Sequence, residues 1–215
     1  MSHKTYESLL LDWDGNLAQT LDIWLDAYQT VLRQYGYQIT NEDVCANFTR
    51  FTSYSEELGV SKPIEAMMLA DQIASKHLPL VELYPDAEEV IKNLYYCGKS
   101  LALITSSTAR HVVAPLERHK LTQYFGSIVT GDQVERRKPD PESLNKAINA
   151  LCTSAEVSLV VGDSETDIKA ANHAGVDSVL FFPSDHQRFY SLKVLRDLQP
   201  TYVIEDLKQL LEIVK

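Results

Sequence analysis

Two aspartates one residue apart are the residues of this chain best suited to carry out chemistry. Asp12 and Asp14 follow the apolar run 9–11 and precede Gly15, whose missing side chain allows a sharp backbone turn. Two carboxylates placed in this way can bind one hard cation, or they can divide the roles of nucleophile and acid between them. An ordinary strand-to-helix turn has the same composition, because Asp and Gly are common in turns. The pair alone leaves both interpretations open.

Three further polar clusters follow apolar runs or precede helical segments later in the chain. They are the hydroxyl cluster Thr105-Ser106-Ser107-Thr108, the basic segment Arg136-Arg137-Lys138-Pro139, and the acidic segment from Gly162-Asp163-Ser164 to Asp167. Hydroxyls and free N–H groups at a helix start suit a phosphate, and paired carboxylates suit a divalent cation. A fixed ammonium can neutralise a crowded anion. Singly, each cluster is equally explained by a helix cap, a solvated turn or a favourable helix dipole.

The hydrophobic pattern predicts a parallel sheet whose strand ends carry these clusters. The predicted strands are Ser8 to Asp12, Ser100 to Thr105, Ile128 to Thr130, Leu159 to Gly162, Ser178 to Phe181 and Tyr202 to Ile204. Several are apolar at consecutive positions, as in strands covered on both faces. Segments with helical periodicity separate most of them, which is typical of βαβ units. We therefore predict an α/β fold built on a doubly wound, Rossmann-like parallel sheet.

Residues 20–82 interrupt this alternation of strands and helices. They contain no convincing strand, but they show helical periodicity near 21–36 and 63–78 around a polar middle. The pattern predicts a helical cap domain at 20–82, inserted into a core domain made of 1–19 and 83–215. A further packed layer of a single domain is the alternative interpretation.

The composition is that of an ordinary globular protein. The chain has 215 residues, of which 45% are hydrophobic and 23% charged, and its net charge of −10 gives no general attraction to nucleic acid or anionic lipid. Three cysteines without paired spacing indicate neither a disulfide framework nor a zinc site. The polar N-terminus and the absence of a long apolar run predict a cytoplasmic protein with a small-molecule ligand and no membrane partner. The oligomeric state is not predicted.

In chain order, the four clusters resemble the four motifs of the haloacid dehalogenase (HAD) superfamily of phosphohydrolases. The motifs read here as Asp12-Trp13-Asp14-Gly15, Thr105 with Ser106, Lys138-Pro139, and Gly162-Asp163-Ser164 through Asp167. The resemblance extends over essentially the whole chain. The insert between the first two motifs resembles the branch with a small helical cap, which includes phosphoglycolate phosphatases and β-phosphoglucomutases.

The resemblance implies a role for each acid of the first motif. Asp12 is expected to attack phosphorus and form an aspartyl-phosphate, which water then hydrolyses. Asp14 is expected to act as general acid and base. A Mg²⁺ ion is expected to bind Asp12, the main-chain carbonyl of Asp14, and Asp163.

The resemblance also implies which residues bind the phosphate. Thr105 and the Ser106 N–H are expected to hold the phosphoryl oxygens, and Lys138 to balance their charge. Asp167 is expected to order metal-bound water or Lys138. In the predicted cap, Arg50 is a candidate contact for a second anionic group on the substrate.

The implied activity is a Mg²⁺-dependent phosphatase acting on a small phosphorylated metabolite, similar to phosphoglycolate or a sugar phosphate. The second acid, Asp14, argues against the dehalogenase branch, which lacks it. Mutase-like transfer within a sugar phosphate is an alternative, although Gly162 stands where the mutase pattern more often has an acid. A catalytically silent binding protein is a third hypothesis, motivated by Trp13 and Asn16, which depart from the family's usual small aliphatic residue and threonine.

Overall fold

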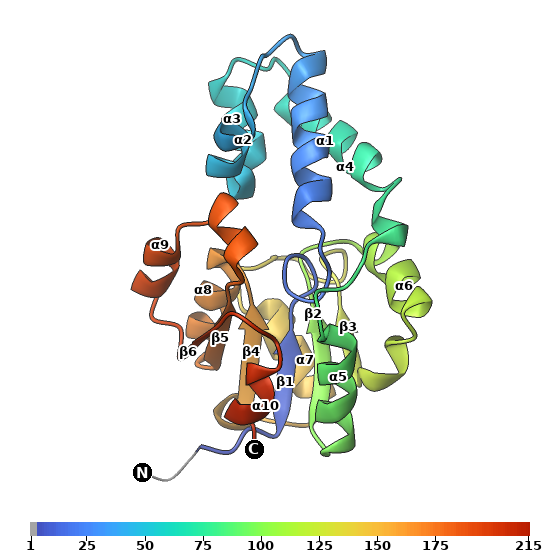
Figure 1. Ribbon diagram of the computed structural model, residues 1–215, viewed down its shortest axis with the longest axis vertical. Helices are drawn as coiled ribbons and strands as arrows, with labels where there is room; N and C mark the ends of the chain where they lie inside the picture. The colour runs from blue at the N-terminus through green and yellow to red at the C-terminus, as the bar shows by residue number, and fades with distance from the viewer. Residues whose placement is uncertain (1–3) are drawn as a thin grey trace.

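A six-stranded parallel sheet forms the centre of the molecule, in the order β3-β2-β1-β4-β5-β6 (Figure 1). The structure, a computed structural model, describes residues 4–215. The strands are β1 (Ser8–Leu11), β2 (Ser100–Ile104), β3 (Ser127–Val129), β4 (Ser158–Gly162), β5 (Asp177–Phe181) and β6 (Tyr202–Ile204). All six predicted strands are confirmed, with ends that differ by at most one residue.

Helices fill the connections between the strands and the segment between β1 and β2. The α-helices are α1 (Leu21–Gln34), α2 (Asn41–Ala46), α3 (Phe51–Glu57), α4 (Pro63–Ala74), α5 (Ala87–Tyr96), α6 (Ala109–Arg118), α7 (Glu142–Ala150), α8 (Glu165–Ala174), α9 (Leu192–Asp197) and α10 (Gln209–Ile213). Short 3₁₀ turns are η1 (Phe48–Arg50), η2 (Leu78–Leu80), η3 (Thr122–Tyr124), η4 (Ala155–Val157) and η5 (Ser184–Arg188).

Both faces of the sheet are buried, which explains the consecutive apolar residues of its strands. In β1, Leu9 and Leu11 pack with side chains of α5, α6 and α10. Leu10 points to the opposite face and packs with α7 and α8. Burial of each leucine stabilises the fold by roughly 1.5–3 kcal/mol. The predicted doubly wound α/β fold is confirmed.

The strand order creates a crevice between β1 and β4. The chain runs from β1 outward through β2 to β3, then crosses back to place β4 on the other side of β1. In open parallel sheets, a crevice forms where the strand order reverses in this way, because the connections after the two central strands run to opposite sides. Groups that follow β1 and β4 are therefore brought to one crevice.

Helices α1 to α4 stand beyond the carboxyl ends of the strands (Figure 1). They share an apolar cluster, which includes Val31 of α1 and Ala70 of α4 and is joined by Phe189 from the segment after β5. In the described part of the chain, no helix combines the length and apolar character that a membrane span requires. The boundaries at residues 20 and 82 between a core and a cap domain stay a prediction.

The predicted polar middle of this segment contains two further helices, α2 and α3. A reciprocal capping box begins α2: Asp43 N–H donates to Thr40 Oγ1 at 3.1 Å, and Thr40 N–H donates to Asp43 Oδ2 at 3.2 Å. The helix predicted at 63–78 ends earlier, at Ala74. The next turn contains Pro79, which has no N–H to continue an α-helix.

Candidate active site

The four polar clusters meet at the carboxyl edge of the sheet. Strand β1 pairs with β2 on one side and with β4 on the other, so Asp12 lies between the residues that follow those two strands. A cleft of about 400 Å³ lies here, and residues of all four clusters line it. Its lining includes Asp12, Ser106, Lys138 and Asp163. The tertiary structure thus brings the predicted chemical groups into one site.

A buried lysine joins two of the acids. Lys138 Nζ lies 2.7 Å from Asp12 Oδ1 and 2.5 Å from Asp167 Oδ1, and the three side chains are 3%, 6% and 0% exposed. Burial acts to lower the pKa of Lys138, but the two carboxylates outweigh it and hold the pKa above its ordinary value. Lys138 therefore stays charged inside the protein. A cis peptide bond links it to Pro139.

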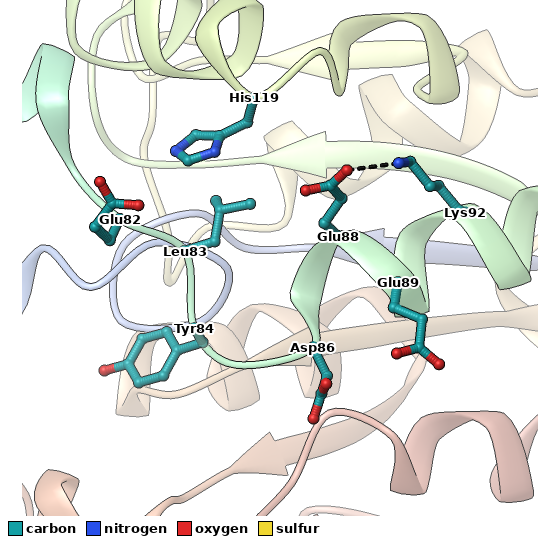
Figure 2. Close-up of a pocket in the computed structure, with 8 residues that line it drawn as sticks. All are labelled: Glu82, Leu83, Tyr84, Asp86, Glu88, Glu89, Lys92 and His119. Atoms are coloured by element: carbon teal, nitrogen blue, oxygen red, sulfur yellow. Dashed lines mark hydrogen bonds and ion pairs between the residues drawn. The ribbon is translucent and has the colours of Figure 1, made fainter.

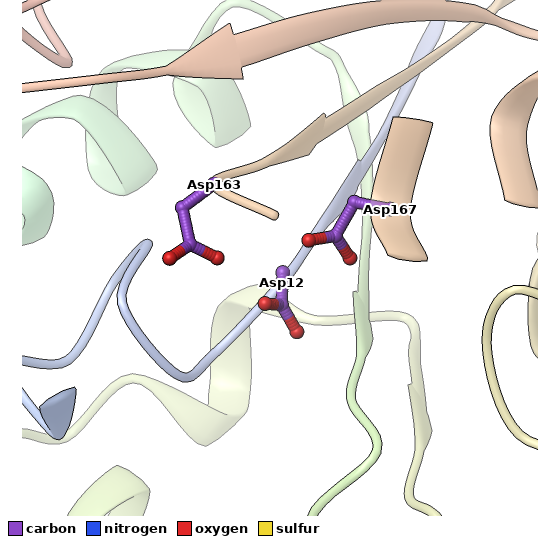
Figure 3. A group of neighbouring side chains, drawn as sticks. All are labelled: Asp12, Asp163 and Asp167. Atoms are coloured by element: carbon purple, nitrogen blue, oxygen red, sulfur yellow. The ribbon is translucent and has the colours of Figure 1, made fainter. Parts of the chain in front are cut away.

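Three buried carboxylates form a group with the geometry of a cation site (Figure 3). Asp12, Asp163 and Asp167 each offer an oxygen within 4.8 Å of the others. Burial, and next the Asp167 carboxylate, raise the pKa of Asp12 to about 8 and that of Asp163 well above its ordinary value. Within the described residues, the buried Asp163 Oδ2 has no hydrogen-bond partner. One ammonium cannot balance three carboxylates, and this all-oxygen donor set fits a hard divalent cation.

Asp14 has different partners from Asp12, although only one residue separates them. The Ser107 hydroxyl donates to Asp14 Oδ2 at 2.7 Å, and the Thr105 hydroxyl lies 3.3 Å from the same oxygen. The Trp24 indole N–H, from α1, lies 3.4 Å from Asp14 Oδ1. Asp14 is partly exposed to the cleft, whereas Asp12 is buried. The sequence clusters indicated Thr105, but neither Ser107 nor Trp24 was predicted to contact this acid.

The two unusual residues of the first motif support the turn that separates these acids. Asn16 is fully buried, and its Nδ2 donates to the main-chain carbonyl of Asp12 at 3.0 Å. Trp13 is also fully buried and packs in the apolar cluster on one face of the sheet. Gly15 has a φ of 70°, and a Cβ there would lie 2.3 Å from Asp163 Oδ2. The turn therefore requires glycine both for its conformation and for the close approach of Asp163.

Gly15→Ala is expected to destabilise the protein more than Gly175→Ala does. Gly175 has a similar φ of 67°, but a Cβ added there would meet no atom within 4 Å, so only backbone strain of about 1–2 kcal/mol applies. At Gly15 the clash with Asp163 adds to that strain. Urea unfolding of both variants measures the difference. Equal losses would show that Asp163 moves aside without cost.

The hydroxyl cluster lies in the loop between β2 and α6. Ser107 N–H donates to Thr105 Oγ1 at 3.0 Å, which holds the Thr105 side chain in place. Ser106, Ser107 and Thr108 line the cleft. At Gly131 a Cβ would lie 2.2 Å from the Ser106 carbonyl oxygen, so this glycine lets the loop pack closely against its neighbour. The loop thus presents donors to the cleft at the start of a helix, where an anion is favoured.

Arg50 lies away from the cleft, whereas the other predicted site residues line it or, as Thr105 and Asp167 do, contact residues that line it. Its guanidinium makes two contacts of 2.6 Å with Glu57, and its side chain is 46% exposed. The cleft is lined instead by the neighbouring Phe48 and Thr49. The observed position gives no support to Arg50 as a substrate contact, because its charge is already paired outside the cleft.

A buried histidine near the carboxylates was not predicted from the sequence, because no motif includes it. His186, in η5, is fully buried; its Nε2 lies 2.7 Å from the Tyr84 hydroxyl and its Nδ1 3.9 Å from Asp163 Oδ2. Burial lowers the pKa of His186 to about 4, so the ring is neutral at pH 7. Tyr84 lies in the connection between the helical segment and α5. Through His186, this connection is in contact with the surroundings of Asp163.

A second hollow, of about 470 Å³, lies where the connection from the helical segment enters α5 (Figure 2). Its lining comes from residues 82–84, from Asp86 and α5, and from His119. Lys92 donates to Glu88 at 2.5 Å within it. The hollow has an excess of carboxylates and is separate from the cleft that holds the four clusters.

Comparison with known proteins agrees with this arrangement. A family model of haloacid dehalogenase-like hydrolases matches residues 9–181. A phosphoglycolate phosphatase from Vibrio cholerae is 29% identical over 227 residues, covering 98% of both chains. The pyrophosphatase PpaX of Bacillus mycoides is 30% identical over 210 residues, covering 96% of this chain and 95% of its own. The crystal structure of a hydrolase from Pseudomonas syringae has the same fold, with a TM-score of 0.80, 21% identity and 96% coverage of both chains.

The family match spans most of the chain, and both relatives align over nearly its full length. The predicted enzyme class, a phosphatase of the HAD type, is confirmed. The chain therefore belongs to the haloacid dehalogenase-like hydrolase family.

Proposed function

We propose that this enzyme is a Mg²⁺-dependent phosphatase that hydrolyses a small phosphorylated metabolite through an aspartyl-phosphate. The observation that carries the proposal is the contrast between its two neighbouring acids. Asp12 is buried against Lys138 and the other carboxylates, whereas Asp14 faces the cleft among hydroxyls and an indole. Acids in such different environments suit different roles. The names of the two relatives support a small phosphorylated substrate.

The proposed reaction has two steps. An Asp12 carboxylate oxygen attacks phosphorus, the bond from phosphorus to the leaving oxygen breaks, and a protonated Asp14 gives its proton to that oxygen. Water then attacks the phosphorus of the aspartyl-phosphate while the Asp14 carboxylate takes a proton from it. Inorganic phosphate leaves, and the Asp12 carboxylate is restored.

The remaining residues bind and neutralise the phosphoryl group. Thr105 and the Ser106 N–H are proposed to hold its oxygens, and Lys138, fixed by Asp167, balances their charge. Asp12, Asp163 and the main-chain carbonyl of Asp14 are proposed to hold Mg²⁺, with Asp167 beside them. The ion would reduce the repulsion between the anionic nucleophile and the anionic phosphate.

We also propose that residues 20–82 act as a cap domain over this site. Their apolar cluster, which apart from Phe189 and Tyr190 is made of residues 21–78, supports a unit with a core of its own, and the Trp24 indole brings α1 against Asp14. A cap that excludes water would strengthen the electrostatic interactions of the closed site.

Protein stripped of metal with EDTA is expected to release no phosphate, and added Mg²⁺ to restore release. The assay is colorimetric, on a panel that includes phosphoglycolate, pyrophosphate and sugar phosphates. No release from any ester by protein with an intact circular dichroism spectrum would contradict the proposal.

Product analysis separates hydrolysis from phosphoryl transfer. A Cβ at Gly162 would lie 2.4 Å from Asp167 Cγ, so the acid that the mutase pattern often carries there would displace Asp167. We therefore expect inorganic phosphate as the product. An isomeric sugar phosphate that forms only with a bisphosphate activator would instead indicate a mutase.

A further inference from the structure

The wall of the cleft that faces the catalytic acids is aromatic. Trp24, Tyr28 and Phe48 line the same cavity as Asp12 and Asp14. The Trp24 and Tyr28 rings lie 5.9 Å apart, and those of Tyr28 and Phe48 5.5 Å apart. These three residues, which we call the aromatic wall, come from α1 and η1.

The aromatic wall is supported from behind, so it is a preformed surface. Tyr28 stacks on Phe51 with ring centres 4.0 Å apart and planes 10° apart. Phe48 meets Phe189 edge to face at 5.1 Å. Because the rings are held by their neighbours, a ligand that contacts them does not have to order them first.

The charges around the cleft do not favour a second anion on the cap side. The basic side chains that line it are Lys138 and Arg137, whose Nε donates to the Gly131 carbonyl oxygen, and both come from the loop before α7 and not from the cap segment. In the cap segment, Arg50 pairs with Glu57 and Lys62 with Glu65, away from the cleft.

The charged side chain that the cap segment does contribute to the lining is acidic. It is Asp71, which pairs with Arg110. Next to it, His111 is buried, lies 3.4 Å from Asp71 and is bonded to Ser75 at 2.8 Å, and burial followed by the Arg110 charge lowers the pKa of His111. On the cap side, an anionic leaving group would therefore meet flat rings and an acid already paired with Arg110, with no unpaired cation from the cap segment in the lining.

We propose that the leaving group of the substrate carries an uncharged planar ring, and that Phe48 and Trp24 select it. This inference rests on the proposed phosphatase function. A cavity of about 400 Å³ is large enough for a phosphate and a small ring system. Aromatic side chains favour another ring through offset or edge-to-face contacts, beyond the area that is buried. The class therefore includes aromatic phosphate monoesters and excludes small carboxylated ones as the preferred substrates.

Two phosphate esters of equal size test the preference for a ring. Benzyl phosphate and cyclohexylmethyl phosphate both release a primary alcohol, but only the first presents a planar ring. We expect kcat/KM to be about threefold to tenfold higher for benzyl phosphate, and lower for phosphoglycolate than for either. Equal values for the two rings would overturn the proposal. Phosphoglycolate as the best substrate would also overturn it, while leaving the phosphatase function intact.

Binding of the matching phosphonates provides a readout that does not need turnover. Benzylphosphonate is expected to quench Trp24 fluorescence at lower concentration than cyclohexylmethylphosphonate. If no ester is hydrolysed, the phosphatase function fails, and this comparison still decides whether the cleft prefers a ring. Equal affinities would overturn the preference.

Three variants separate the contribution of the lining ring from those of packing and of the indole N–H. Phe48→Leu is expected to bring the benzyl to cyclohexylmethyl ratio close to one. Phe189→Leu removes the ring behind Phe48 without changing the lining, so it is expected to lower stability and retain the ratio. Trp24→Phe keeps a ring but loses the N–H near Asp14, so its ratio is also expected to stay. An equal loss of the ratio in the Phe48 and Phe189 variants would assign the effect to packing alone.

Discussion

Asp12→Asn is expected to abolish phosphate release while the protein stays folded. The amide cannot act as the nucleophile, and loss of such a group in a concerted site lowers kcat by at least about 10⁴-fold. A beryllofluoride adduct that mimics the aspartyl-phosphate should form with the parent and not with the variant. Unchanged turnover would remove Asp12 from the nucleophile role. Formation of the beryllofluoride adduct by the variant would also remove Asp12 from the nucleophile role.

The difference in stability between Asp12→Asn and the parent should depend on pH, in favour of the variant as pH rises. In the folded, metal-free protein the pKa of Asp12 is about 8, against 3.8 for the unfolded carboxyl. The folded state therefore holds a proton that the unfolded state has lost, and the stability from this group falls as pH rises through 8. Asparagine has no such proton. Without metal, the variant should gain stability over the parent between about pH 4 and pH 8, measured by urea unfolding.

Lys138→Met is expected to cause the largest loss of stability of any single change at the site. It leaves the carboxylates of Asp12 and Asp167 buried without their common partner, and removal of one member of a buried ion pair costs about 3–5 kcal/mol. Activity should also be lost, because the charge that balances the phosphoryl group is gone. Urea unfolding and the phosphate assay measure the two effects separately.

An exposed lysine provides the matched control. Lys62 pairs with Glu65 at the surface, so Lys62→Met should unfold at nearly the same urea concentration as the parent. Adding Asp167→Asn to Lys138→Met removes one of the unpaired charges and should recover part of the lost stability. If Lys138→Met unfolds at the same urea concentration as the parent, the lysine does not hold the carboxylates together.

The strands and the motifs at their ends could be predicted because their signals are local. A strand buried on both faces has to be apolar at consecutive positions, and the turn after β1 has to contain a residue that accepts a positive φ. The capping box of Thr40 and Asp43 was an available local signal for α2. The position of Arg50 gave no comparable signal, because its pairing with Glu57 depends on how η1 meets α3.

The sequence by itself determined the α/β sheet, the order of the four motifs and the acids that belong to them. Parallel strands place their carboxyl ends at one edge, so residues more than a hundred positions apart could be assigned to one site without coordinates. Only the tertiary structure decided the partners of each acid and the residues of the aromatic wall. Trp24 reaches Asp14, and Phe48 lines the cleft whereas Arg50 does not. These positions depend on side-chain packing between segments that are distant in the sequence, for which no short stretch of sequence carries a signal.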